Sequence, residues 1–182
     1  SKNGSFKGSQ VGGWGLGLPP EALRSLNQPD RLSRGINLIK SAAQQVGENA
    51  HNLGFRGALG VDSMITIEQG VVRVVPILEI NPRFTMGRLA LELSGRCTGV
   101  GGWFFITKNE ISKAGYKNIE ALIDRIEGSE VTVSGDGRSL DSGTLFTTEP
   151  RHAERLYTVL CVDKTLDAAK TRWANLGFKW PL

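Results

Sequence analysis

The sequence has few of the residues that form covalent cross-links or bind transition metals. Its 182 residues include only two cysteines, Cys97 and Cys161, and two histidines, His51 and His152. Two cysteines exclude a disulfide framework and a four-cysteine zinc site, and two histidines exclude most histidine-rich metal chemistry. We therefore expect packed, reduced thiols, and a chemistry that depends on other side chains.

Long apolar runs and blocks of like charge are also absent. No run approaches the roughly 20 residues that span a bilayer, and the polar opening has no apolar segment of a signal peptide. We therefore expect a cytoplasmic protein with no membrane partner. The formal net charge is +4, but the 22 Lys and Arg residues are interspersed with 18 Asp and Glu. This mixture disfavours a nucleic-acid partner and leaves a few arginines for an anionic ligand. Because the first residue is Ser1 and not Met, we expect the sequence to begin within a longer protein.

What is present indicates a globular chain with a sizeable core, since 40% of its residues are hydrophobic. The first 30 residues are glycine-rich and poorly periodic. The segment GGWGLGLPP resembles a phosphate loop, but it follows no strand and lacks the Lys-Ser/Thr ending. We interpret it as a turn with Trp14 and Leu16 packed inward, followed by a short helix, EALRSL.

Residues 33–53 have the spacing of an amphipathic helix. The apolar residues recur at intervals of three and four, so they form one stripe that ends at Leu53. Ser33 is the expected N-cap, and Gly54 is the expected stop. His51 falls on the polar flank, where we expect it to be solvated.

A β-hairpin is predicted next. Residues 61–67 and 71–80 are rich in β-branched side chains, and Gln69-Gly70 between them is a turn signal. Residues 86–93 are then predicted to be helical. The second half is less informative, although it contains several short elements. They are a loop or short helix at 106–118, a helix at 119–126 capped by Asn118, short strands with Gly-Asp-Gly turns at 128–148, a buried strand at 156–162, and a last helix that is capped by Thr165 and stopped by Gly177.

The predicted hairpin places acidic side chains together. With a two-residue loop at Gln69-Gly70, opposed residue numbers sum to 139, so Asp62 faces Ile77. Side chains alternate along a strand, so Glu79 becomes a diagonal neighbour of Asp62, about 7–8 Å away between backbones. Asn81 follows on the same face.

Two carboxylates and an amide oxygen are hard ligands that suit Mg²⁺ or Mn²⁺. Pro82 ends the strand, so Arg83 is free to hold a phosphate or carboxylate. Apolar neighbours indicate that Glu79 is partly buried and needs a cation. The alternative left open by spacing alone is a pair of solvent-facing acids on a hairpin whose other face is core.

These residues resemble the metal-binding half of ATP-grasp ligases. The family pattern G-x-D followed by E-I-N-P-R is matched by Gly60-Val61-Asp62 and by Glu79-Ile80-Asn81-Pro82-Arg83, and the extension TMGR resembles the branch that includes peptide ligases. The likeness covers about thirty residues, together with the preceding helix. It implies an α+β fold, the C-terminal ATP-grasp lobe, with an antiparallel sheet flanked by helices.

The resemblance also implies roles for individual residues. Asp62, Glu79 and Asn81 would be the metal ligands, with Glu79 bridging two ions. Arg83 would be the catalytic residue that steadies the γ-phosphate and an acyl-phosphate intermediate, and Arg88 a weaker candidate for the acceptor's carboxylate. The implied activity is that of an ATP-dependent carboxylate–amine ligase, with Mg²⁺ or Mn²⁺ as cofactor and ATP as co-substrate.

The N-terminal ATP-grasp lobe has no counterpart in the 56 residues before Gly57. We therefore expect residues 1–95 to form the C-terminal lobe, residues 96–182 an α/β extension, and the missing lobe to act as a partner in cis or in trans. Two alternatives remain: a degenerate ATP-grasp-like interaction or regulatory domain without catalysis, and an unrelated basic binding domain.

Overall fold

The computed structural model describes residues 7–13, 29–69 and 71–181, and the chain divides into two compact units. The hairpin unit is Gly17–Leu89, and the sheet unit combines Ser1–Leu16 with Ala90–Leu182. The hairpin unit thus ends at Leu89, whereas the sequence analysis expected one boundary, after residue 95. The predictions for Trp14, Leu16 and the EALRSL helix lie outside the described residues.

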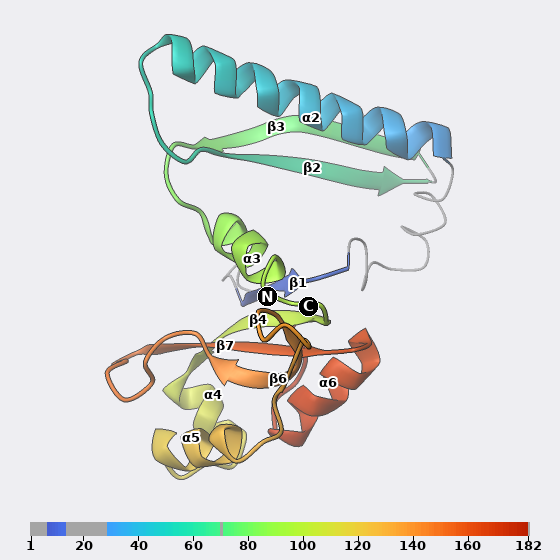
Figure 1. The fold of residues 1–182 in the computed structure, drawn as a ribbon. Helices are drawn as coiled ribbons and strands as arrows, with labels where there is room; N and C mark the ends of the chain where they lie inside the picture. The colour runs from blue at the N-terminus through green and yellow to red at the C-terminus, as the bar shows by residue number, and fades with distance from the viewer. Residues whose placement is uncertain (1–6, 14–28, 70, 182) are drawn as a thin grey trace. The chain divides into compact units, whose positions relative to one another are not determined.

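The hairpin unit consists of a long helix and a two-stranded antiparallel sheet (Figure 1). Its elements are α2 (Pro29–Asn52), β2 (Gly60–Glu68), β3 (Val71–Asn81) and the start of α3 (Met86–Ser94). The predicted strands, their turn and the helix at 86–93 are confirmed. Gln69 in the turn has a φ of +51°, the sign that such tight hairpin turns require.

Helix α2 packs on the hairpin through the predicted stripe. Val46 and its apolar neighbours are half-buried, and an added Cβ on Gly35 would lie 3.0 Å from Cγ2 of Val74. The predicted cap is wrong, because α2 begins at Pro29 and Ser33 lies inside it. Proline is favoured in a first helical turn, since its φ is preset and its missing N–H is not needed there.

The C-terminal end of α2 follows the prediction with one exception. Gly54 ends the helix with a φ of +89°, its N–H donating to the carbonyl of His51 at 2.9 Å, and His51 is exposed as expected. Leu53 was expected in the buried stripe but is 89% exposed. Leu53 comes after the last helical residue, so its side chain no longer points in the same direction as the apolar stripe of the helix.

The sheet unit is a five-stranded antiparallel sheet in the order β1-β4-β7-β6-β5. The strands are β1 (Gly8–Val11), β4 (Val100–Thr107), β5 (Thr132–Val133), β6 (Leu140–Phe146) and β7 (Leu156–Asp163). The helices are α4 (Lys108–Lys113), α5 (Ile119–Glu127) and α6 (Leu166–Asn175). The expected α+β class, with an antiparallel sheet flanked by helices, is thus confirmed.

Apolar side chains are buried on both faces of this sheet. Phe104, Tyr157 and Trp173 belong to the larger core, which packs under α4, α5 and α6. Trp103 and Leu160 belong to the smaller core on the other face, with Ala90 of α3. The strand predicted to be buried at 156–162 is buried except for its first residue, Leu156, which is 44% exposed, and both cysteines are free thiols.

The predicted caps of the sheet unit are present. The Asn118 side chain accepts from the N–H of Ala121 at 3.1 Å, and the Thr165 hydroxyl from that of Ala168 at 3.2 Å. Gly177, with a φ of +81°, follows α6 as expected. No helix in the described ranges combines the length and apolarity that crossing a membrane requires.

Candidate metal centre

The register of the hairpin brings the two predicted carboxylates closer than expected. From the turn as far as Met64, opposed residue numbers sum to 139, as predicted, with Met64 opposite Val75. The register then shifts, so that Asp62 lies opposite Glu79 and not opposite Ile77. Directly opposed residues have Cβ atoms about 4.5–5.5 Å apart. The expected diagonal arrangement is therefore wrong, and a direct pair replaces it.

A bulge in β3 causes this shift. One residue of β2, Ser63, stands against three residues of β3, Pro76 to Leu78. Proline has no N–H to donate to the ladder, so regular pairing is interrupted there. The Ser63 hydroxyl instead donates to the carbonyl of Pro76 at 2.8 Å. Because the shift is two residues, the two carboxylates stay on one face of the hairpin.

That face is the one directed away from α2. The side chain of Val74 points toward α2, where it lies close to Gly35. Ile65 is paired with Val74, so its side chain is on the same face of the hairpin. Side chains alternate along β2, so Asp62 points to the opposite face, together with its partner Glu79. The site is consequently on a surface of the hairpin that α2 does not cover.

A chain of hydrogen bonds joins three of the predicted site residues. The amide nitrogen of Asn81 donates to Oδ2 of Asp62 at 3.2 Å, and Nη2 of Arg83 donates to Oδ1 of Asn81 at 3.2 Å. Asn81 is only 7% exposed, whereas Asp62 and Arg83 are exposed. The N–H of Arg83 also donates to the carbonyl of Asn81 at 2.8 Å, which turns the chain out of β3.

The expected burial of Glu79 is wrong. Glu79 is exposed, and so are the apolar residues beside it, including Leu78, which is 60% exposed. Burial of this carboxylate was inferred from its apolar neighbours, but these neighbours are themselves not covered. Burial therefore gives no separate reason for a cation at Glu79.

Gly60 and Thr85 pack closely next to the site, at the start of the helix that carries Arg88. An added Cβ on Gly60, the partner of Asn81, would lie 2.7 Å from Cγ2 of Thr85. A larger residue at this position would displace the Thr85 side chain from the strand. The Thr85 hydroxyl accepts from the N–H of Arg88 at 3.2 Å and so caps α3. Arg88 is exposed in the first turn of that helix.

The donor set fits a hard divalent cation. Two exposed carboxylates share one face with a buried amide, and the amide oxygen has a second lone pair beyond the one that Arg83 uses. Oxygen ligands of this kind suit Mg²⁺ or Mn²⁺, with water or phosphate completing the coordination. Among the described residues, no group of three or more His, Cys, Asp and Glu is arranged so that it could hold a metal ion. A cation held here would depend on Asn81 as its third protein ligand.

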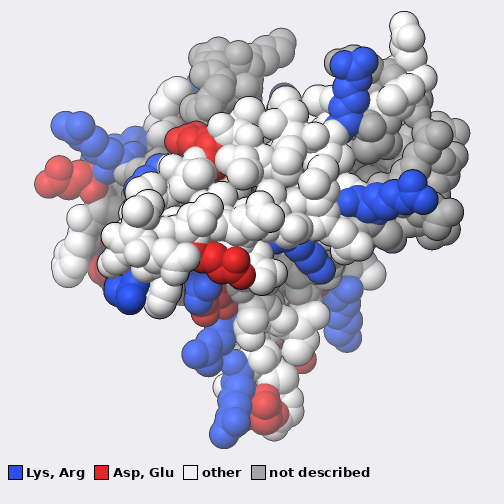
Figure 2. Space-filling view, turned by 90° about the horizontal axis from the view of Figure 1, so that it is seen from above, with Lys and Arg blue, Asp and Glu red and all other residues white. Residues whose placement is uncertain are grey.

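Charged side chains of both signs are mixed on the surface. On the face shown in Figure 2, Lys and Arg side chains lie in several places, some of them beside Asp or Glu. A nucleic-acid surface would gather them into a stripe or patch.

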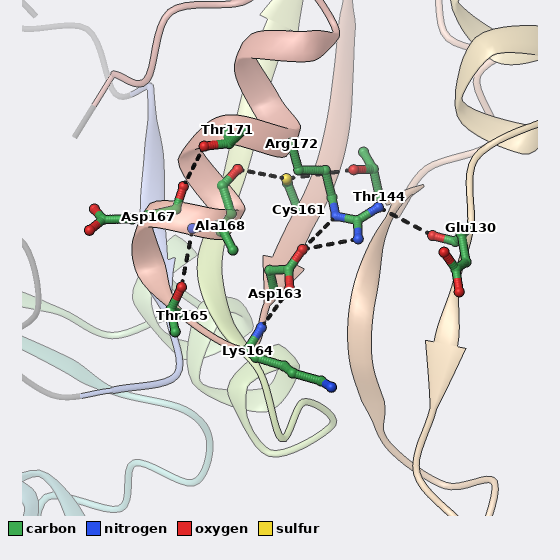
Figure 3. A network of polar contacts seen from close by, with 11 residues as sticks. Glu130, Thr144, Cys161, Asp163, Lys164, Thr165, Asp167, Ala168, Thr171 and Arg172 are labelled. Carbon is green, nitrogen blue, oxygen red and sulfur yellow. Dashed lines mark hydrogen bonds and ion pairs between the residues drawn. The ribbon is translucent and has the colours of Figure 1, made fainter.

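A second polar cluster in the sheet unit was not found by sequence reasoning. Arg172 of α6 donates through Nε to Oδ2 of Asp163 at 3.0 Å and through Nη1 to the carbonyl of Glu130 at 3.3 Å (Figure 3). It joins β7, α6 and the segment before β5. Asp163 and Arg172 are nine residues apart, so only the fold reveals their pairing. The guanidinium is held by protein groups, which indicates a structural role.

Comparison with known proteins gave no relative. No family model, no curated protein and no solved structure matches this chain.

Proposed function

We propose that this chain is the C-terminal, metal-binding portion of an ATP-grasp ligase that joins a carboxylate to an amine. The observation that carries the proposal is the direct pairing of Asp62 with Glu79, with Asn81 hydrogen-bonded to Asp62. The motif resembles that of the family, and the geometry that supports the proposal is three oxygen-bearing side chains on one face of the hairpin. The α+β architecture is compatible with the C-terminal lobe of that family.

Asp62, Glu79 and Asn81 would hold the Mg²⁺ or Mn²⁺ ions of the nucleotide. The bound cation supplies neutralisation of the phosphate charge. The protein groups do the positioning, and no side-chain nucleophile is required. A mechanism without a side-chain nucleophile is consistent with the small number of histidines and cysteines in this chain.

In this proposal Arg83 would bind the transferred phosphate. It is anchored to Asn81 by one of its guanidinium nitrogens, and its exposed side chain keeps other donors available. A planar guanidinium can hold a phosphate oxygen pair bidentately. Arg83 would orient the γ-phosphate for attack by the carboxylate substrate and then bind the acyl phosphate. Arg88 would bind the carboxylate of the amine substrate.

The proposal includes a second lobe, in cis or in trans, that completes the nucleotide site. A two-stranded hairpin is marginal by itself and is stabilised by more strands or by a packed helix. Here α2 covers one face, while apolar side chains of β3 are exposed. They are Ile77, Leu78 and Ile80. A further lobe packed near these residues would shield this apolar surface from water.

The same exposed residues favour one other function, a degenerate ATP-grasp-like module that only binds a partner protein. The two functions differ in whether the carboxylates of the site are needed. A binding module needs the apolar surface but neither carboxylate, whereas a ligase needs both Asp62 and Glu79.

Metal binding by the whole chain tests the proposal directly. Electron paramagnetic resonance of Mn²⁺ measures free and bound ion, with and without ATP. We expect the Asp62→Asn and Glu79→Gln variants to lose about tenfold or more in Mn²⁺ affinity, since each removes one of two anionic ligands. Glu48→Gln, which changes an exposed carboxylate on α2, is the matched control.

ATP should increase the melting temperature only when Mg²⁺ or Mn²⁺ is present. Release of phosphate from ATP, measured across mixtures of amino acids, reports ligase turnover. If wild type, both site variants and Glu48→Gln bind Mn²⁺ equally, the site assignment is wrong. If Mn²⁺ and ATP bind but the addition of an N-terminal lobe gives no turnover with any carboxylate and amine, the degenerate module is favoured.

A further inference from the structure

A pocket of about 280 Å³ lies in the sheet unit, where α4 is followed by α5. It is bordered by these two helices, by the turn that joins them and by one residue of β7. An apolar cavity of about 150 Å³ is enough to bind benzene, so this pocket has room for a small ring with polar substituents. All of its lining residues belong to the sheet unit, so the pocket is separate from the candidate metal site.

The residue of β7 at this pocket is Tyr157, which is almost completely buried. Only 1% of Tyr157 is exposed, and its ring belongs to the larger core. Its hydroxyl makes no hydrogen bond with any part of the chain that the structure describes. Every fully enclosed polar atom of the described side chains does have a partner. The hydroxyl is therefore the part of Tyr157 that reaches out of the core, at the pocket that Tyr157 borders.

The hydroxyl of Tyr157 is placed to bond a ligand. A tyrosine hydroxyl donates one hydrogen bond and can accept another. The partner of Tyr157 on β4 is Ile106, which is apolar and offers neither. Leaving such a buried group without a partner costs free energy, so a ligand that bonds to it is favoured over one of the same shape that does not.

The charged residues at the pocket are basic. Lys108 and Lys117 border it, and its described lining includes no Asp or Glu. Both lysines are exposed, and neither side chain has a hydrogen-bond or ion-pair partner within the described ranges. A cleft lined by charge of one sign concentrates ligands of the opposite sign. The pocket therefore favours an anion.

Helix caps fix the backbone beside each lysine. Thr107, which precedes Lys108, is the N-cap of α4 and forms a capping box with Glu110. Asn118, which follows Lys117, is the N-cap of α5 and accepts from the N–H of Ala121 at 3.1 Å. The two cations are thus carried by ordered backbone, which lowers the cost of holding a ligand between them.

Partly covered apolar side chains complete the pocket. Tyr116 and Ile119 line it, and both are half-buried where they pack against the larger core. The aliphatic stems of the two lysines add further apolar contact. The pocket consequently combines apolar walls, an unbonded hydroxyl and two positive charges.

We propose that this pocket binds a small hydroxy-carboxylate, with its carboxylate at Lys108 and Lys117 and its hydroxyl bonded to that of Tyr157. The lysines select an anion over a cation of the same shape, and Tyr157 selects a ligand with a second polar group.

Calorimetric titration of the whole chain with 3- and 4-hydroxybenzoate tests the proposal, since the two isomers place the hydroxyl at different distances from the carboxylate. Benzoate lacks the hydroxyl, and the hydroxybenzylamine of matching ring position has the opposite charge. We expect the tighter hydroxybenzoate to bind about fivefold or more tighter than benzoate. We expect it to bind about tenfold or more tighter than the amine.

The variant Tyr157→Phe isolates the role of the hydroxyl. It removes one oxygen and no hydrogen bond between described residues, so the melting temperature should change little. The variant should bind the hydroxybenzoate no tighter than benzoate, while its affinity for benzoate stays within about twofold of wild type. An equal loss for both ligands would assign Tyr157 a structural role only and would overturn the proposal.

The variant Lys108→Gln/Lys117→Gln should weaken hydroxybenzoate binding about fivefold or more. Lys40→Gln/Lys164→Gln is the matched control, since it removes the same charge from exposed lysines outside the pocket. The control should change the affinity by less than about twofold. Absence of binding at millimolar concentration, equal affinity for the amine, or equal loss in both double variants would contradict the proposed site.

Discussion

The side-chain amide of Asn81 donates to Oδ2 of Asp62 at 3.2 Å, from one strand of the hairpin to the other. The same amide accepts from Arg83 through its oxygen, and Asn81 is buried. Replacement by alanine removes both hydrogen bonds at once. We expect Asn81→Ala to destabilise the hairpin by about 1–2 kcal/mol.

Hydrogen exchange of the β2 and β3 amides measures this loss locally, without assuming that both units unfold together. Asn37→Ala, which changes an exposed asparagine on α2, is the control and should leave these amides unaffected. Equal exchange rates in Asn81→Ala and wild type would show that the buried amide contributes nothing to hairpin stability.

The hairpin shows how far sequence reasoning reached. Alternation and the Gln69-Gly70 turn were enough to place Asp62 and Glu79 on one face. That they lie directly opposite each other depends on the bulge at Pro76. A proline in a strand indicates that regular pairing is interrupted, but it does not give the number of residues in the bulge. The exposure of Glu79 was predicted wrongly because local apolarity does not tell whether anything packs above it.

Strand β4 was not predicted. Its sequence contains Gly101 and Gly102 near its start, and glycine is depleted in strands. In the structure these glycines allow close backbone approach, because an added Cβ on Gly101 would overlap the carbonyl oxygen of Cys161 on β7. The requirement comes from a strand some sixty residues away in sequence, so local pattern could not reveal it.

The same contact predicts a severe effect of Gly101→Ala. The overlapping atoms belong to the backbone of β7, so β4 and β7 must separate to admit the methyl group. We expect a loss of roughly 3 kcal/mol or more in the free energy of unfolding of the sheet unit. Gly135→Ala is the control, since nothing lies within 4 Å of its added Cβ. Urea titration followed by tryptophan fluorescence compares the two variants, and equal midpoints would contradict the prediction.

The pair of Asp163 and Arg172 should contribute more to stability than the exposed ion pairs of the same unit. Nε and Nη2 of Arg172 both lie 3.0 Å from Oδ2 of Asp163, and the two side chains are only 18% and 23% exposed. Asp163→Asn removes the charge from a partly buried partner of a guanidinium. We expect it to destabilise the sheet unit by about 2 kcal/mol.

Glu127→Gln tests the contrast with a weak pair. Its carboxylate lies 3.8 Å from Arg151, and both side chains are more than half exposed, so the change should stay within about 0.5 kcal/mol. Thermal unfolding at low and high salt distinguishes the two pairs. An Asp163→Asn effect as small as that of Glu127→Gln would show that the close geometry adds no stability.

The buried thiol of Cys161 should make the sheet unit less stable at alkaline pH. Burial raises its pKa from 9.0 to about 11, in spite of a hydrogen bond from Thr144 that acts in the opposite direction. Above pH 9 the unfolded chain loses this proton, while the folded chain keeps it up to about pH 11. The folded state then binds more protons, so the free energy of unfolding falls as the pH rises. Over this window the loss is about 2–3 kcal/mol.

Lysines and tyrosines titrate in the same window, so the contribution of Cys161 has to be measured as a difference. Urea unfolding near pH 8.5 and near pH 10.5, for wild type and Cys161→Ala, gives that difference, and the variant should lose about 2 kcal/mol less than wild type. Cys97→Ala is the second comparison. The pKa of Cys97 is also raised by burial, but this thiol is only half-buried, so its removal should change the pH dependence less. The same alkaline slope in wild type and Cys161→Ala would mean that the thiolate of Cys161 is tolerated in the folded core.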